Sequence, residues 1–182
     1  MNICVFCSAS EIAEKYTKPA AEFAKLLGEH GHTLVWGGSD KGIMKVIASG
    51  VQDAGGKIVG ISVEFLKEHT RRNADEMIIA KTLGERREAM LERADAIVAM
   101  VGGIGTLDEV TEVLELKKHG VHKKPIVILS TGSFYEGLKQ QLEKMEKEGF
   151  LRSAKIPLPL DELIYFADTP KDAMRYIEAH GN

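Results

Sequence analysis

Short apolar runs alternate along the chain with longer stretches in which apolar residues recur at helical spacing. Short runs bounded by turn residues predict buried strands, whereas recurrence every three or four residues predicts helices with one packed face. The predicted strands are Ile3–Cys7, Thr33–Trp36, Lys57–Ile61, Ala96–Met100, Pro125–Leu129 and, as a further candidate, Ile164–Phe166. The predicted helices are Thr17–Gly31, Gly42–Ala54, Leu83–Arg93, Thr106–His119, Phe134–Glu148 and Lys171–Ala179.

This alternation predicts the α/β class, with a Rossmann-like doubly wound parallel sheet in a three-layer α/β/α arrangement. The strands lack a polar face, which is typical of strands covered by helices on both sides. A length of 182 residues favours a single nucleotide-binding domain over residues 1–182. The segment Glu64–Glu76 is polar and has no regular period, so it is either a loop over the site or an ordinary surface connection.

A glycine-rich turn lies between the fourth predicted strand and the helix that follows it, with the sequence Val101-Gly102-Gly103-Ile104-Gly105-Thr106-Leu107-Asp108-Glu109. Backbone N–H groups in such a turn can surround an anion at the positive end of the helix. Glu109, one turn inside this helix, has two interpretations. It is a catalytic acid beside a bound phosphate, or it completes a capping box that begins at Thr106. The spacing leaves both open, and the two roles can coexist.

Two other predicted strands end in turns that suit the same pocket. One turn contains Gly37, Gly38 and Gly42, and the other contains Ser8 and Ser10. Because the carboxyl ends of parallel strands share one edge of a sheet, we expect one common pocket that includes Ser10 and Gly38. The first strand is not followed by G-x-G-x-x-G, and no glycine turn contains G-K-[ST], so the usual NAD and ATP signatures are missing.

Arg86 and Arg87 fall beside or within the apolar stripe of the predicted helix Leu83–Arg93. A guanidinium group that points inward needs an anionic partner, which would place the pair at a site. The alternative is a pair of solvated arginines whose aliphatic stems cover the helix.

Composition and charge exclude several classes of function. A net charge of −3 argues against a nucleic-acid partner, and no apolar run approaches the roughly 20 residues of a membrane span. The N-terminus is typical of a first strand rather than a signal peptide, and we expect Cys4 and Cys7 to be reduced and buried in a cytoplasmic protein. No metal site is predicted, because His119 and His122 lack further ligands at suitable spacing.

The chain resembles the LONELY GUY (LOG) family of cytokinin-activating phosphoribohydrolases, often mislabelled lysine decarboxylases. The family pattern P-G-G-x-G-T-x-x-E matches 101–109, with Val101 in the proline position. The family's R-K pair matches Arg86 and Arg87 at the same separation of 23 residues from the glutamate (109 − 86 = 23). Further landmarks are the glycine cluster at 37–45 and the segments 120–125 and 132–135.

The resemblance implies hydrolysis of the N-glycosidic bond of a nucleoside 5′-monophosphate, AMP or an N6-substituted AMP, without a metal or organic cofactor, by a homodimer or higher homo-oligomer. It implies that Arg86 and Glu109 are catalytic. The substrate contacts that we predict are Glu68, Arg87, Gly102, Gly103, Ile104, Gly105, Thr106, Leu107 and Asp108, together with Ser10 and Gly38.

A function of another class remains as the alternative. Related folds hold molybdenum cofactor or nucleotides without converting them, so a non-catalytic carrier is the second hypothesis. The sequence argues against lysine decarboxylation. That reaction would need a lysine bound to pyridoxal phosphate and a much larger protein, and no feature of the sequence indicates either.

Overall fold

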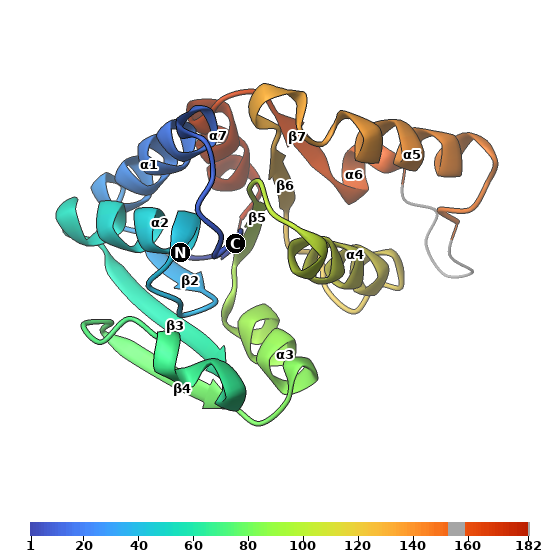
Figure 1. Ribbon diagram of the computed structural model, residues 1–182. Helices are drawn as coiled ribbons and strands as arrows, with labels where there is room; N and C mark the ends of the chain where they lie inside the picture. The colour runs from blue at the N-terminus through green and yellow to red at the C-terminus, as the bar shows by residue number, and fades with distance from the viewer. Residues whose placement is uncertain (153–158, 182) are drawn as a thin grey trace.

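A computed structural model describes residues 1–152 and 159–181 (Figure 1). Within these residues, seven parallel strands form one sheet in the order β4-β3-β2-β1-β5-β6-β7. The strands are β1 (Asn2–Phe6), β2 (Thr33–Trp36), β3 (Lys57–Val63), β4 (Glu76–Ala80), β5 (Ala96–Ala99), β6 (Ile126–Leu129) and β7 (Tyr165–Ala167).

Helices cover both faces of this sheet (Figure 1). On one face lie α1 (Glu14–Glu29), α2 (Gly42–Asp53) and α7 (Pro170–His180). On the other lie α3 (Leu83–Arg93), α4 (Ile104–Lys118), α5 (Glu136–Lys147) and α6 (Leu160–Leu163). Two short 3₁₀ turns, η1 (Glu64–His69) and η2 (Thr131–Ser133), complete the described elements. Among all of these helices, none combines the length and the apolar character needed to cross a bilayer.

The central strand β1 shows why the strands carry no polar face. Ile3 and Val5 pack in the core beneath α1, α2 and α7, whereas Cys4 and Phe6 pack in the core beneath α3 and α4. Successive side chains of a strand point to opposite faces, and here both faces are dry. Cys4 and Cys7 are both free and buried, as predicted.

The order of strands reverses at β1. The chain builds outward from β1 to β4, then returns to place β5 on the other side of β1 and builds outward again to β7. The turns that follow β1 and β5 are joined where the Ser8 N–H donates to the Val101 carbonyl at 3.3 Å. In open α/β sheets, ligands bind in the crevice at such a reversal.

The structure confirms the fold class and five of the predicted strands to within two residues at each end, with the further candidate realised as β7. It adds β4, which the sequence interpretation missed. This strand lies at the edge of the sheet and pairs only with β3, and most of its side chains are partly exposed. The segment Glu64–Glu76 proves to be the turn η1 followed by a connection into β4.

Candidate active site

A cavity of about 370 Å³ opens at the carboxyl ends of the central strands. The turns after β1, β2 and β5 all border it, as predicted from the topology. Of the predicted site residues, the cavity is lined by Arg86, Gly103, Gly105, Thr106 and Glu109.

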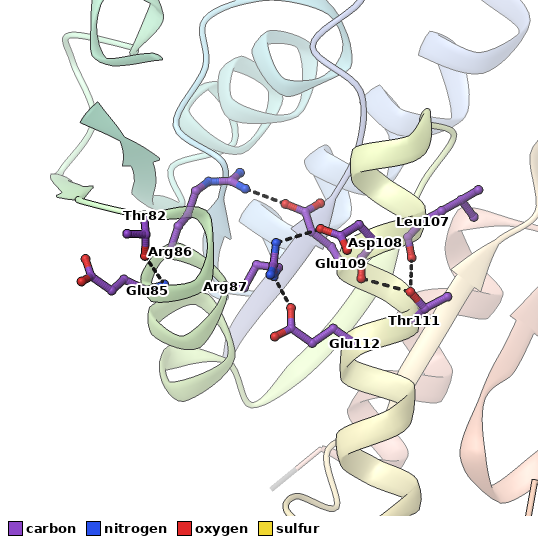
Figure 2. Close-up of polar contacts among 9 residues, drawn as sticks. All are labelled: Thr82, Glu85, Arg86, Arg87, Leu107, Asp108, Glu109, Thr111 and Glu112. Carbon is purple, nitrogen blue, oxygen red and sulfur yellow. Dashed lines mark hydrogen bonds and ion pairs between the residues drawn. The ribbon is translucent and has the colours of Figure 1, made fainter. Parts of the chain in front are cut away.

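The centre of the cavity wall is a buried ion pair between α3 and α4 (Figure 2). Arg86 Nη1 donates to Glu109 Oε1 at 2.7 Å, and Arg86 Nε donates to the carbonyl of Ile61 at 2.9 Å. The two residues are only 8% and 6% exposed. The alternative of a solvated arginine is therefore wrong for Arg86, whose guanidinium is held by β3 on one side and by Glu109 on the other.

Burial governs the electrostatics of this pair. It raises the pKa of Glu109, because a charged carboxylate loses its hydration in the cavity wall. The Arg86 charge and its hydrogen bond oppose that shift and favour the carboxylate. Glu109 is thus a carboxylate whose proton affinity is increased, which is a property of groups that act as general bases.

The first glycine turn makes room for the guanidinium group. A Cβ atom on Gly37 would lie 2.3 Å from Arg86 Nη2, a contact that no side chain at this position can avoid without moving Arg86. Glycine at position 37 is therefore a requirement of the ion pair, and it links the glycine turn after β2 to the pair on the opposite sheet face.

The structure overturns the capping-box interpretation of Thr106 and Glu109. Helix α4 begins at Ile104, Gly103 is its N-cap, and no side chain caps it. Thr106 is already inside the helix and buried, and a Cβ atom on Gly102 would clash with its hydroxyl at 2.1 Å. The Glu109 carboxylate bonds to Arg86 rather than to the helix start.

The uncapped start of α4 leaves backbone N–H groups available to an anion. The first N–H groups of a helix have no partner within it, and they lie at the positive end of its dipole. The space where Cβ atoms of Gly103 and Gly105 would project is open. This terminus is a site suited to a phosphate group.

A second helix terminus borders the same cavity. Helix α2 begins at Gly42, and its N-cap residue Lys41 provides no side-chain cap. Helices α3 and α7 begin instead with a threonine, Thr82 or Thr169, whose hydroxyl accepts an N–H bond from the third residue of the helix. The starts of α2 and α4 at the cavity therefore lack the threonine cap that α3 and α7 have.

Arg87 takes a different direction from Arg86 (Figure 2). Its Nη1 donates to Asp108 at 2.8 Å, and it also forms an ion pair with Glu112. Arg87 joins α3 to α4 outside the cavity, which fixes the two helices that carry the buried pair. Its predicted contact with substrate stays a prediction.

The other predicted contacts do not line the cavity. Ile104 is 81% exposed and points away from the core. Glu68 is exposed and borders a neighbouring hollow beside Lys41 and Arg72. The remaining residues that flank the cavity without lining it are Ser10, Gly38, Gly102, Leu107 and Asp108.

Several lining residues were not predicted. The turn η1 brings Leu66 and His69 over the cavity, which decides in favour of a loop over the site. Its position is fixed because the Asp40 N–H donates to the His69 carbonyl and the Arg71 N–H donates to the Gly38 carbonyl, both at 2.9 Å. The unpredicted lining residues are Cys7, Ala9, Ser39, Lys41, Met44, Ser62, Leu66, His69 and Leu83.

A tyrosine supports the glycine turn from behind. The hydroxyl of Tyr135 donates to the carbonyl of Met100 at 2.8 Å, directly before the turn begins. Burial raises the pKa of Tyr135 to about 12, so the hydroxyl remains a donor at all physiological pH values. This contact gives a structural reason for the landmark at 132–135.

The sheet, its crevice and its uncapped helix terminus define a Rossmann-like α/β protein in which a helix start suited to an anion lies beside a buried arginine–glutamate pair. The chain belongs to the LONELY GUY family, whose model, described as "Possible lysine decarboxylase", matches residues 44–177.

Named relatives agree with this assignment. The chain is 33% identical over 176 residues to the cytokinin riboside 5′-monophosphate phosphoribohydrolase of Mycobacterium tuberculosis, covering 96% of this chain and 91% of that protein. It is 36% identical over 155 residues to a protein of the same name from Arabidopsis thaliana, covering 84% and 73%. A solved molybdenum cofactor binding protein from Rippkaea orientalis shares the fold with a TM-score of 0.75 at 20% identity, covering 98% of this chain and 95% of that one.

Proposed function

We propose that this protein hydrolyses the N-glycosidic bond of a nucleoside 5′-monophosphate, releasing the free base and ribose 5-phosphate. The observation that carries the proposal is the buried Arg86–Glu109 pair on the wall of a cavity that an uncapped helix terminus also borders. The names of the relatives in Mycobacterium tuberculosis and Arabidopsis thaliana support the same reaction.

The chemistry needs a carboxylate beside the ribose. As the bond between C1′ and the base nitrogen breaks, positive charge develops on the ribose ring. The Glu109 carboxylate stabilises that charge, and it orients and deprotonates the water molecule that attacks C1′. Its increased proton affinity favours the second role, since a stronger base accepts the proton more readily.

Arg86 and the glycine turn have complementary roles in this proposal. The guanidinium holds the carboxylate in one orientation and keeps it ionised in a buried place. The N–H groups at the start of α4, from Gly103 to Thr106, bind the 5′-phosphate. Anchoring the phosphate at one end of the cavity presents C1′ and the base to the catalytic pair.

A carrier of nucleotide or molybdenum cofactor is the second candidate function. The solved relative from Rippkaea orientalis favours it, because its fold matches nearly the whole chain. The place of the buried Arg86–Glu109 pair on the cavity wall supports the hydrolase, because hydrolysis needs a carboxylate beside the ribose and carriage alone does not.

The test is release of free base from a panel of nucleoside monophosphates that includes AMP and N6-substituted AMP, followed by chromatography. We expect stoichiometric base and ribose 5-phosphate from at least one member. Glu109→Gln and Arg86→Ala each remove one electrostatic contact and reduce the rate by about a hundred- to thousand-fold, with the fold retained.

Glu143→Gln makes the same chemical change at an exposed position on α5 and keeps full activity. Circular dichroism should show that the inactive variants are folded. Tight binding of one ligand without release of base from any member of the panel would establish the carrier instead.

A further inference from the structure

Two histidines and a glutamate lie close together at the amino-terminal ends of the strands, whereas the cavity lies at the carboxyl ends. His30 follows α1, His32 directly precedes β2, and Glu178 lies near the end of α7. His30 Nδ1 lies 2.7 Å from Glu178 Oε1, and His32 Nε2 lies 3.0 Å from the same oxygen. The three donor atoms all lie within 4.8 Å of one another.

The backbone holds both imidazoles on one side of the chain. Gly31, between the two histidines, has a φ of +72°, a left-handed conformation that ends α1 and turns the chain into β2. The His30 N–H donates to the Leu26 carbonyl at 3.0 Å, and the His32 N–H donates to the Leu27 carbonyl at 3.1 Å. The two ligands on this turn are therefore positioned before any ion binds.

Helix α7 brings the third ligand from the other end of the chain. Glu178 is 146 residues from His32, and α7 packs beside α1 in the same layer (Figure 1). The strands are parallel, and these residues lie where β2 begins rather than where it ends. The cluster is therefore separated from the cavity by the length of the sheet.

The donor set suits a divalent transition metal. Two imidazole nitrogens and one carboxylate oxygen are a familiar set of zinc ligands, with bonds of about 2.0–2.2 Å. Ligand atoms at the corners of a tetrahedron with such bonds lie about 3.3 Å apart. Both histidines hydrogen-bond to Glu178 Oε1 at distances about 0.6 and 0.3 Å shorter than this (3.3 − 2.7 and 3.3 − 3.0), so the partly exposed side chains must move outward to accommodate an ion.

The three ligand side chains differ in their exposure to solvent, and the more exposed ones leave a path for an ion. The side chain of His32 is 11% exposed, whereas those of His30 and Glu178 are 40% and 36% exposed. The ion can enter from the side of His30 and Glu178, and that side leaves room for water as a fourth ligand.

We propose that His30, His32 and Glu178 form a binding site for a divalent transition metal ion, with Zn²⁺ the ion that best suits the donors. A bound ion joins the turn between α1 and β2 to the last helix. Because it binds only when these two segments are assembled, it stabilises the folded chain.

The test uses full-length protein without a histidine tag, freed of metal by a chelator and titrated with Zn²⁺ in a calorimeter at pH 7.5. We expect one ion per chain at this site and a rise in Tm when Zn²⁺ is present. His30→Ala and Glu178→Gln each remove a ligand and weaken binding by at least about tenfold, with the Tm shift reduced in parallel. Glu178→Gln retains the shape and a hydrogen-bond acceptor, so loss of binding does not reflect loss of folding.

The matched control is His119→Ala on α4. His119 also bonds to a carboxylate, Glu115, at 2.9 Å, but within the described residues no third potential metal ligand joins this exposed pair. Zn²⁺ affinity in this variant should equal that of the unmodified protein. The proposal is overturned if the unmodified protein binds no Zn²⁺, or if His30→Ala and Glu178→Gln bind it as tightly as the control.

Discussion

Glu109 carries its charge where burial disfavours it, and this sets the pH dependence that we expect. Burial raises its pKa above the ordinary value of 4.5, and the ionised form is the one that assists attack of water. Base release should therefore fall as pH decreases through the raised pKa, with an acidic limb above 4.5. The measurement is kcat/KM as a function of pH.

Protonation of Glu109 does not unfold the protein, so unfolding does not explain this loss of activity at low pH. A carboxyl whose pKa is higher in the folded state than in the unfolded state destabilises the fold once it is ionised, and this cost is relieved as pH falls through the folded pKa. Circular dichroism across the same pH range should thus show folded protein where activity is already lost. An acidic limb at or below 4.5 would remove Glu109 from the role of base.

The pairing of Arg86 with Glu109 could not be predicted from the local sequence pattern. The spacing of Thr106 and Glu109 fits a capping box, and local spacing cannot reveal that the helix starts two residues earlier, at Ile104. Nor can it reveal that Gly37 leaves the space that Arg86 occupies. Both facts depend on contacts between segments far apart in the chain. The resemblance to the family implies that Arg86 and Glu109 act together, and the structure shows that they form a buried ion pair beside Gly37.

Among the elements, the capped helices α3 and α7 offer a controlled comparison. Thr82 and Thr169 each accept a bond from a helix N–H, at 3.1 and 3.2 Å. Replacing either by alanine should lower the free energy of unfolding by about 1 kcal/mol in urea denaturation.

Activity should separate these two variants. The Arg86 N–H donates to the Thr82 carbonyl at 3.1 Å, so loosening the first turn of α3 also loosens Arg86. We expect Thr82→Ala to reduce kcat several-fold while Thr169→Ala leaves it unchanged, although the two lose similar stability. Equal activities would show that the first turn of α3 does not position Arg86.

Helices with a regular recurrence of apolar residues could be predicted from the sequence, whereas the edge strand β4 could not. The sequence predicts helix α3 with its observed ends, Leu83 and Arg93, because Leu83, Met90 and Ala94 recur at helical spacing. Strand β4 follows a charged stretch and is buried on only part of its surface, so its few apolar residues resemble a surface loop. Its pairing with β3 is a tertiary effect that outweighs local pattern.

For the whole molecule, a ligand that occupies the cavity should stabilise the fold, because it contacts α3, α4 and η1 together. Glu109→Gln allows this to be measured without turnover. At a ligand concentration 100 times Kd, the free energy of unfolding should rise by about 2.7 kcal/mol, visible as a higher Tm.

The comparison of AMP with adenosine isolates the phosphate. If the start of α4 binds the 5′-phosphate, AMP should raise Tm at concentrations where adenosine does not. Equal shifts with the two ligands would place the phosphate outside the glycine turn.

The position of β1 at the centre of the sheet has a consequence for synthesis. It leaves the ribosome before both of its neighbours, and one of them, β5, begins only at Ala96. About 60 residues separate the end of β2 from the start of β5, which at about 5–20 residues per second is a delay of ~3–12 s. Throughout that interval one edge of β1, whose residues Ile3 to Phe6 are all buried in the folded protein, has no partner strand. The yield of folded protein should therefore depend on how quickly, and with what chaperone protection, residues 37–95 are translated.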